Sequence, residues 1–76
     1  MEPLTQAMKF VTVEADLFQS VYYDEINHTL YMKFRDSPTL KFEKVPRFRY
    51  NGLMGAPRKD AYFKTFIKNQ FLTKPV

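Results

Sequence analysis

Two stretches of the chain alternate between apolar and polar residues, which is the pattern of a β-strand with one buried face. In residues 30–35 every second residue, beginning with Leu30, is apolar. The same alternation begins with Leu40 in residues 40–43. Residues 36–38, which are Asp, Ser and Pro, predict a turn between the two stretches. The pattern therefore predicts two antiparallel strands that are neighbours in one sheet.

The residues before this pair predict further strands and a turn. Residues 18–23 are apolar and aromatic without a helical period, which favours a strand. Asp and Asn in residues 24–28 are turn formers, so this strand is expected to turn back into the next one. Residues 9–13 contain β-branched side chains and are a candidate short strand at the sheet edge. Pro3 predicts that residues 1–7 form a flexible terminus.

Proline and glycine residues delimit two short helices after the strands. The proline at position 46 ends the sheet, because it lacks the N–H that a strand ladder needs, and it suits the first turn of a helix. Residues 47–53 are predicted to form that helix, which Gly52 and Gly55 keep short. Asp60 is a predicted N-cap for a second helix. The apolar stripe of this second helix has a helical period and consists of Tyr62, Phe63, Phe66, Ile67 and Phe71.

Strands followed by helices indicate an α+β fold. We expect an antiparallel meander of three strands, with a candidate fourth strand at its edge, followed by two short helices packed on one face. The helices should cover the face that carries Leu30, and the opposite face should stay in contact with solvent. Residues 8–73 are expected to form a single domain, with residues 74–76 as a C-terminal tail.

The composition excludes several classes of site. The 76 residues include no cysteine, so the chain has no disulfide, no thiolate metal ligand and no cysteine nucleophile. A small secreted domain usually needs disulfides, and this favours a cytoplasmic location. The sequence has no pattern of a signal peptide. It also has no run of roughly 20 apolar residues, so no contact with a membrane is expected.

Residues suited to catalysis are few and scattered. His28 is the only histidine, and it lies in the predicted turn without a second metal-ligating histidine. The serines and threonines lack the glycines that surround a nucleophile elbow. The only glycines, Gly52 and Gly55, do not form a phosphate-binding loop. The sequence therefore predicts a protein that is not an enzyme and that uses no cofactor or metal.

The net charge of +4 is unevenly distributed along the chain. Residues 1–28 carry one lysine and five carboxylates, a net of −4, whereas residues 29–76 carry eleven Lys or Arg and three carboxylates, a net of +8. A basic half is a feature of proteins that bind polyanions. In the alternative interpretation, the acidic and basic halves meet in the fold and partly neutralise each other.

Basic and aromatic residues are predicted to share the outer face of the sheet. The period of two places Tyr31, Lys33 and Arg35 on that face, and Lys41 on the neighbouring strand joins them. Lysine and arginine neutralise phosphates, and aromatic rings stack on bases. In the alternative interpretation this is an ordinary solvated strand face. The candidate nucleic-acid-binding residues are Tyr31, Lys33, Arg35, Lys41, Arg58 and Lys59.

An ordered set of residues between positions 13 and 71 resembles the KTSC domain, a family named for a C-terminal extension of some lysyl-tRNA synthetases. The matching positions are Tyr23-Asp24, Leu30 with Phe34, Val45-Pro46, Leu53, Ala56-Pro57, Lys59, Phe63 and Ile67. The chain departs from the family pattern at three places. Glu14-Ala15-Asp16 replaces a serine-rich entry to the first strand. Leu40-Lys41-Phe42 replaces Tyr-x-Tyr, and Arg58-Lys59-Asp60 replaces Ser-Lys-Gly.

The resemblance implies a stand-alone, divergent KTSC-like domain from a bacterium or a phage. It implies RNA binding by association with the synthetase, which is an argument from analogy. The first hypothesis is therefore a small accessory module that binds RNA or another single-stranded nucleic acid. The alternative is a protein–protein interaction module that modulates a host complex, because Tyr and Arg are enriched at interfaces. The open sheet edge at residues 9–13 makes the expected state a monomer or a weak homodimer.

Overall fold

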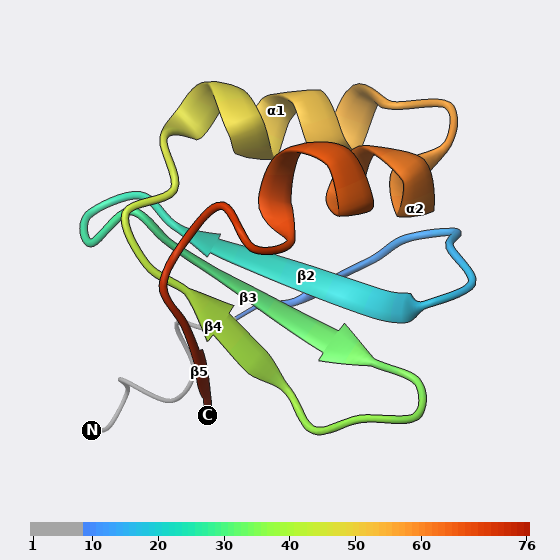
Figure 1. The fold of residues 1–76 in the computed structure, drawn as a ribbon, viewed down its shortest axis with the longest axis horizontal. Coiled ribbons are helices and arrows are strands. Elements are labelled where there is room, and N and C mark those ends of the chain that lie inside the picture. The colour runs from blue at the N-terminus through green and yellow to red at the C-terminus, as the bar shows by residue number, and fades with distance from the viewer. Residues whose placement is uncertain (1–8) are drawn as a thin grey trace.

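The computed structural model describes residues 9–76 and has an α+β fold, as the sequence predicts (Figure 1). Its antiparallel sheet has five strands in the order in which they occur along the chain. The strands are β1 (Val11–Thr12), β2 (Phe18–Asp24), β3 (Thr29–Phe34), β4 (Leu40–Phe42) and β5 (Thr73–Pro75). The predicted edge strand in residues 9–13 is therefore present as β1, and the flexible terminus predicted for residues 1–7 lies outside the described residues.

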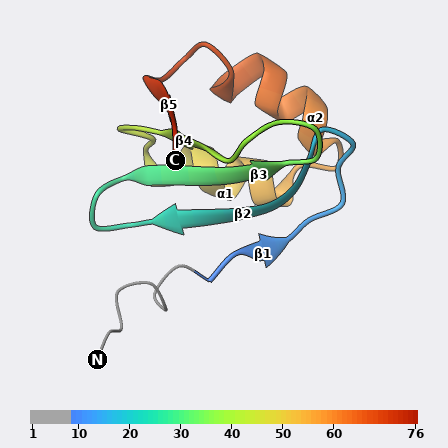
Figure 2. The same ribbon diagram turned by 90° about the horizontal axis from the view of Figure 1, so that it is seen from below.

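The helical layer lies between β4 and β5 in the chain. It consists of α1 (Arg47–Gly55), α2 (Lys59–Tyr62) and the π-helical turn η2 (Phe63–Ile67), which follows α2 without a break. All three cover one face of the sheet (Figure 1). The view from below shows the other face of the strands, where no helix of residues 9–76 lies (Figure 2).

The fifth strand is the main difference from the predicted meander. Residues 74–76 were expected to form a tail, but β5 pairs antiparallel with β4, with Lys74 opposite Lys41. Backbone hydrogen bonds from Glu43 N to Leu72 O (2.9 Å) and from Val76 N to Thr39 O (3.0 Å) extend this pairing. A segment of three residues is too short to show an alternating pattern in the sequence, so β5 is recognised only by its pairing with β4. Proline is compatible with an edge strand, where one side needs no partner.

The core lies between the sheet and the helices, on the face predicted from the alternation. Its buried hydrophobic residues are Val13, Phe18, Val21, Tyr23, Leu30, Met32, Phe42, Val45, Leu53, Phe63 and Ile67. The Phe63 ring is central, because it packs edge-on against three other rings at centroid distances of 5.5–5.9 Å, those of Phe18, Phe34 and Phe42. Such edge-to-face pairs add about 0.5–1.5 kcal/mol each to the free energy of burial.

Asp60 does not cap the second helix as predicted. Arg58 is the residue at the N-cap position, and no side chain accepts a hydrogen bond there. The Asp60 carboxylate instead accepts hydrogen bonds from the backbone N–H groups of Asp16 (2.7 Å) and Leu17 (2.9 Å). These N–H groups lie in the loop between β1 and β2, so the carboxylate fixes this loop to the start of α2. The hydrogen-bond partners lie 43 and 44 residues from Asp60, so the residues around Asp60 in the sequence do not indicate this contact.

The apolar stripe of the second helix is only partly buried. Phe63 and Ile67 are in the core, whereas Phe66 is 38% exposed. Lys68 N donates to Phe63 O (2.8 Å), and this i→i+5 bond widens the last turn. The helix then ends, so Phe71 follows it in irregular chain and packs against the edge of the core.

Candidate nucleic-acid interface

The strand pairing aligns side chains in a row across the helix-free face of the sheet. Tyr22 of β2 lies opposite Tyr31 of β3, Tyr31 lies opposite Lys41 of β4, and Lys41 lies opposite Lys74 of β5. Residues paired in this way point to the same side of a sheet. Their sequence neighbours Val21, Leu30 and Phe42 are buried in the core, so the row itself faces away from the helices.

Three aromatic rings occupy one end of this row. The ring centroid of Tyr22 is 5.8 Å from that of Tyr31 and 5.9 Å from that of Phe10, which precedes β1. The rings are tilted by 35° and 48° to each other, and all three side chains are partly exposed. We call Phe10, Tyr22 and Tyr31 the aromatic row.

Lysines flank the aromatic row. Lys33 is exposed, and its Nζ lies 4.4 Å from the centroid of the Phe10 ring, a cation–π contact. Lys41 continues the row on β4, and no carboxylate of residues 9–76 forms an ion pair with either lysine. Lys74 Nζ lies 3.4 Å from Glu43 Oε2, and this ion pair neutralises part of the charge of Lys74. This face therefore combines partly exposed rings with two lysines that form no ion pair within residues 9–76.

The six candidate residues form two groups in the structure. Tyr31, Lys33 and Lys41 lie on the outer sheet face as the alternation predicts. Arg35 was predicted to share the outer face, but it follows the end of β3 and its guanidinium turns to the carbonyl oxygen of Ala15. Together with Arg58 and Lys59 it lines an open groove of about 870 Å³ beside the loop that joins β1 to β2.

The basic side chains of this groove are partly engaged in structural contacts. Arg35 donates from Nε (3.3 Å) and Nη2 (3.2 Å) to the carbonyl oxygen of Ala15, and Lys59 Nζ donates to Ala56 O (3.0 Å). The groove also has acidic residues in its lining, namely Glu14, Asp16 and Asp60. Its charge is therefore mixed.

Sequence reasoning missed three residues of the sheet face. Tyr22 and Tyr23 are adjacent, and only the register shows that Tyr22 points outward while Tyr23 is buried. Phe10 lies in the predicted edge strand, but its contact with Tyr22 depends on how β1 pairs. Lys74 lies in the segment predicted to be a tail.

Comparison with known proteins identifies the family. The profile of the KTSC domain matches residues 16–71. The chain belongs to the KTSC domain family. It is also similar to the crystal structure of a KTSC domain protein from Yersinia pestis, with 29% sequence identity over 91% of this chain and 97% of that chain and a TM-score of 0.88. A comparison with curated proteins found no match.

The residues of this KTSC domain that match the family pattern build the framework. Leu30, Val45 and Leu53 are fully buried, and Lys59 closes the α1–α2 connection through Ala56 O. The departure at Leu40-Lys41-Phe42 is instructive. The two positions that have lost a tyrosine face inward, opposite Met32 and Leu30, whereas Lys41 faces outward. The missing hydroxyls therefore change the core side of β4 and leave the outer face unaffected.

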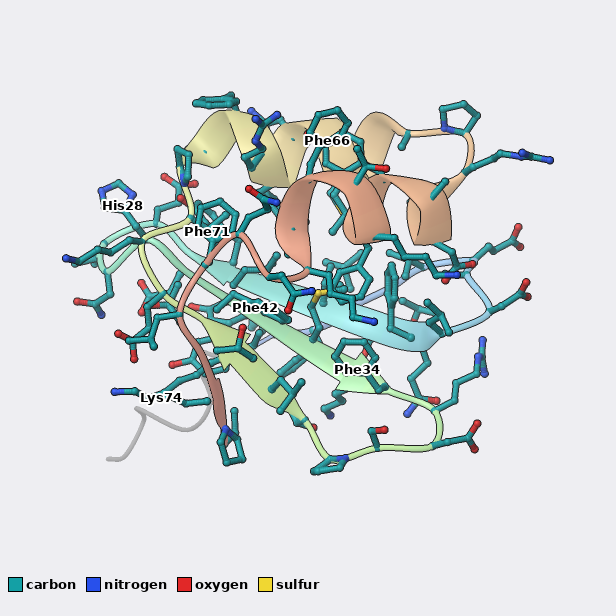
Figure 3. All side chains as sticks on the ribbon, in the orientation of Figure 1. His28, Phe34, Phe42, Phe66, Phe71 and Lys74 are labelled. Atoms are coloured by element: carbon teal, nitrogen blue, oxygen red, sulfur yellow. The ribbon has the colours of Figure 1, made fainter. Side chains whose placement is uncertain are left out.

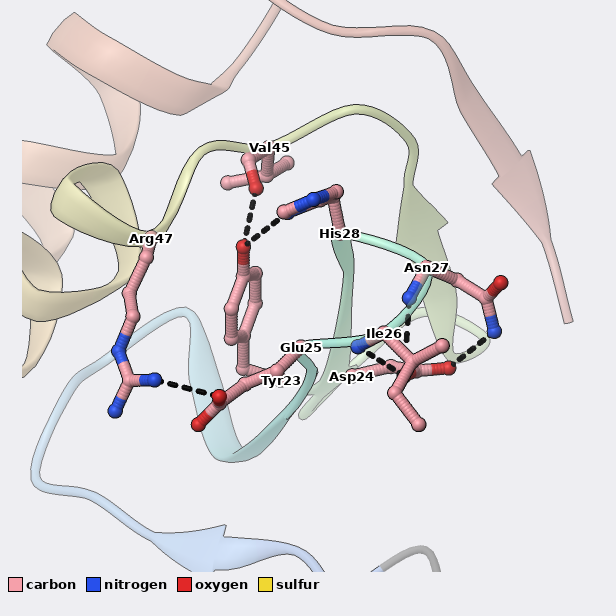
Figure 4. A network of polar contacts seen from close by, with 8 residues as sticks. All are labelled: Tyr23, Asp24, Glu25, Ile26, Asn27, His28, Val45 and Arg47. Atoms are coloured by element: carbon pink, nitrogen blue, oxygen red, sulfur yellow. Dashed lines mark hydrogen bonds and ion pairs between the residues drawn. The ribbon is translucent and has the colours of Figure 1, made fainter.

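The Tyr23 side chain connects the β2–β3 turn of the KTSC domain to the start of α1. Its hydroxyl donates to Val45 O (2.6 Å) and lies 3.3 Å from His28 Nδ1 (Figure 4). Its ring stacks on that of Tyr50 at a centroid distance of 4.9 Å. Burial raises the pKa of Tyr23, and the nearby Arg47 opposes this rise. His28 thus contacts a structural tyrosine, and no group of three potential metal ligands occurs in the described part of the chain.

The turn between β2 and β3 is organised by Asp24. Its carboxylate accepts hydrogen bonds from Ile26 N (3.1 Å), from Asn27 N (3.3 Å) and from Asn27 Nδ2 (2.8 Å) (Figure 4). The side-chain bond from Asn27 is the main reason why the pKa of Asp24 is lowered. Glu25 forms an ion pair with Arg47 at the start of α1 (2.6 Å).

In residues 9–76, no helix has the length and apolar character that crossing a membrane requires.

Proposed function

We propose that this KTSC domain binds single-stranded nucleic acid, RNA in the first place, across the outer face of its sheet. The observation that supports the proposal is the aromatic row with Lys33 and Lys41 beside it, on a face that no helix of residues 9–76 covers. Bases stack on aromatic side chains, while lysines neutralise the phosphates between them.

Single strands suit this face better than duplexes do. The rings of Phe10, Tyr22 and Tyr31 are partly exposed and lie side by side, with centroids 5.8–5.9 Å apart. A base must be unstacked to reach such a ring, and the bases of a duplex are stacked on one another. Each base–ring contact contributes about 1–3 kcal/mol and tolerates any base, so we expect weak sequence preference.

Binding is tested by titrating the protein into a fluorescently labelled single-stranded RNA and following anisotropy. Replacing Tyr31 by Ser removes one ring from an exposed surface and should weaken binding roughly 5- to 150-fold. The slope of log affinity against log salt should be negative. Lys33→Glu should make this negative slope shallower by about 0.7, the value for the loss of one phosphate contact on a single strand.

Lys68→Glu is the matched control for the charge reversal. Lys68 is also exposed, but it lies next to η2 in the helical layer. Its replacement changes the net charge by the same amount and should leave the affinity within about twofold of wild type, because the face that binds is elsewhere. Two results contradict the proposal: no binding to RNA or single-stranded DNA at low salt, or equal losses for Lys33→Glu and Lys68→Glu.

A further inference from the structure

The turn between β2 and β3 presents an apolar side chain to solvent. Ile26 is 88% exposed, more than any other large hydrophobic residue that the structure describes. The three hydrogen bonds to the Asp24 carboxylate hold the backbone around it. The side chain projects from the turn, with Asp24 and Glu25 beside it in the sequence (Figure 4). Residues 24–27, which we call the acidic tip, therefore combine an ordered, exposed apolar side chain with two carboxylates, of which that of Glu25 is paired with Arg47.

A small aromatic groove lies on the helical layer of the same molecule. It has a volume of about 300 Å³ and lies between α1 and the end of η2. Its lining residues are Pro46, Phe48, Arg49, Thr65, Phe66, Gln70 and Phe71, and we call it the Phe48 groove. Phe66 and Phe71 are visible at this side of the helical layer in Figure 3.

The Phe48 groove is positively charged and unusually exposed for its composition. Phe48 lies on helix α1, and its side chain is 63% exposed. The Arg49 guanidinium lies 5.0 Å from the Phe48 centroid and 4.7 Å from the Phe66 centroid. None of the described residues that line the groove is acidic. Phenylalanine and arginine are both enriched at protein interfaces relative to the rest of the surface.

The acidic tip and the Phe48 groove complement each other. One has an apolar side chain beside two carboxylates, and the other has apolar rings beside a guanidinium. Opposite charges at such a contact favour the correct pairing. The tip is also held in place before binding, so little conformational freedom is lost on contact.

The positions of the two features suit a symmetric contact between two copies. Glu25 of the tip forms an ion pair with Arg47, which lies between Pro46 and Phe48 of the groove in sequence. The tip is therefore joined by an ion pair to the start of α1, the helix that contributes Phe48 and Arg49 to the groove. A two-fold axis between them would place each tip against the groove of the other copy, so that both contacts form together.

We propose that this chain forms a weak homodimer in which Ile26 of each copy packs into the Phe48 groove of the second copy. The Asp24 and Glu25 carboxylates then lie near Arg49 of that copy. The dimer uses the helical layer and the β2–β3 turn, and it leaves the outer sheet face free. The proposal does not depend on nucleic-acid binding.

Sedimentation velocity over a range of about 10 μM to about 1 mM tests the proposal. Wild type should shift from monomer to dimer within this range. Ile26→Ser and Phe48→Ser should each raise the dissociation constant at least about tenfold, because each variant homodimer loses both contacts. A heterodimer of the two variants keeps one intact contact, so a mixture should associate more tightly than either variant alone and less tightly than wild type.

Val11→Ser is the matched control. Val11 is an exposed apolar residue in the edge strand β1, so its replacement should leave the dimer unchanged. Circular dichroism checks that Ile26→Ser and Phe48→Ser are folded, as expected for exposed positions. A wild type that stays monomeric throughout overturns the proposal, as does a dimer that Val11→Ser disrupts and Ile26→Ser does not. Lys33→Glu should not affect the dimer, so failure of RNA binding is a separate result.

Discussion

At the scale of single residues, two adjacent tyrosines have opposite roles. Tyr23 is buried and donates a hydrogen bond to Val45 O, whereas Tyr22 is on the outer face beside Tyr31. The Tyr22 hydroxyl forms no hydrogen bond with residues 9–76. Removing the hydroxyl should therefore affect the stability of the fold at Tyr23 but not at Tyr22.

We therefore expect Tyr23→Phe to destabilise the fold. The substitution keeps the ring stacked on Tyr50 but leaves the Val45 carbonyl without this donor, which costs about 1–3 kcal/mol when the group is buried. Urea unfolding should give a lower midpoint with an unchanged slope. Tyr22→Phe is the control and should leave the midpoint nearly unchanged. Equal midpoints for the two variants would contradict the assigned role.

The lowered pKa of Asp24 predicts a pH dependence of stability. Its carboxylate is stabilised in the folded state by hydrogen bonds, chiefly from Asn27, so the folded pKa lies below the ordinary value of 3.8. The contribution to stability is complete above this ordinary value and is lost as the pH falls through the lower folded pKa. The difference in unfolding free energy between wild type and Asp24→Ala should therefore be largest near neutral pH and shrink in acid.

Asp36→Ala separates this effect from the general response to acid. Asp36 lies in the turn between β3 and β4, and its side chain accepts no hydrogen bond from residues 9–76. Urea unfolding series for the three proteins, collected between neutral and acid pH, provide the comparison. An Asp24→Ala difference that stays constant with pH would show that the ionised carboxylate does not hold the turn.

At the scale of elements, close packing between α1 and α2 depends on one glycine. Gly52 lies within α1, and a Cβ atom there would overlap the end of the Tyr62 side chain. Tyr62 itself packs on Phe66 at a centroid distance of 4.7 Å. The glycine thus does not end the helix, as its sequence position suggested, but makes room for a ring of the second helix.

Gly52→Ala should destabilise the protein because it displaces Tyr62. In a Tyr62→Ala background the same change should instead stabilise it by about 0.5–1 kcal/mol, the ordinary advantage of alanine over glycine in a helix. Thermal unfolding of the four proteins of this double-mutant cycle measures the change of sign. Gly55→Ala is the control: no atom lies within 4 Å of a Cβ there, so it should not destabilise the wild type. A stabilising Gly52→Ala in the wild type would show that Tyr62 moves aside at no cost.

At the scale of the whole molecule, the two faces of the sheet differ in what they offer. The helices and the core occupy one face, and the aromatic row with its lysines occupies the other. The basic half of the chain is not gathered into one patch. Lys33 and Lys41 lie on the outer face, Arg58 and Lys59 line the groove beside the β1–β2 loop, and Arg49 lies in the Phe48 groove.

Folding brings some of the charges of the acidic and basic halves of the sequence into contact. Two ion pairs are formed within the described residues, and one of them joins the halves, because Glu25 of the acidic half contacts Arg47 of the basic half. Asp60 reaches in the other direction and holds the backbone of Asp16 and Leu17. The halves therefore meet, while Lys33 and Lys41 on the outer sheet face form no ion pair within residues 9–76.

Local pattern determined much of the fold. The alternation at residues 30–35 and 40–43 predicts β3 and β4 together with their buried faces, because side chains of a strand alternate in direction. Pro46 and Gly55 lie at the two ends of α1, as their residue types predict, whereas Gly52 lies inside it. The order of strands and helices then indicates an α+β fold. Tyr31, Lys33 and Lys41 were correctly placed on the outer face for the same reason.

Only the tertiary structure decided which distant segments meet. The pairing of β5 with β4, the hold of Asp60 on the β1–β2 loop and the contact of Phe10 with Tyr22 all join residues remote in sequence. Alternation and helix propensity are free-energy preferences of neighbouring residues, so they can be read along the chain. Register and long-range partners depend on the packing of the whole core, and no short stretch of sequence carries that information. The framework of this KTSC domain could thus be predicted from its sequence, whereas the aromatic row depends on the pairing of the strands.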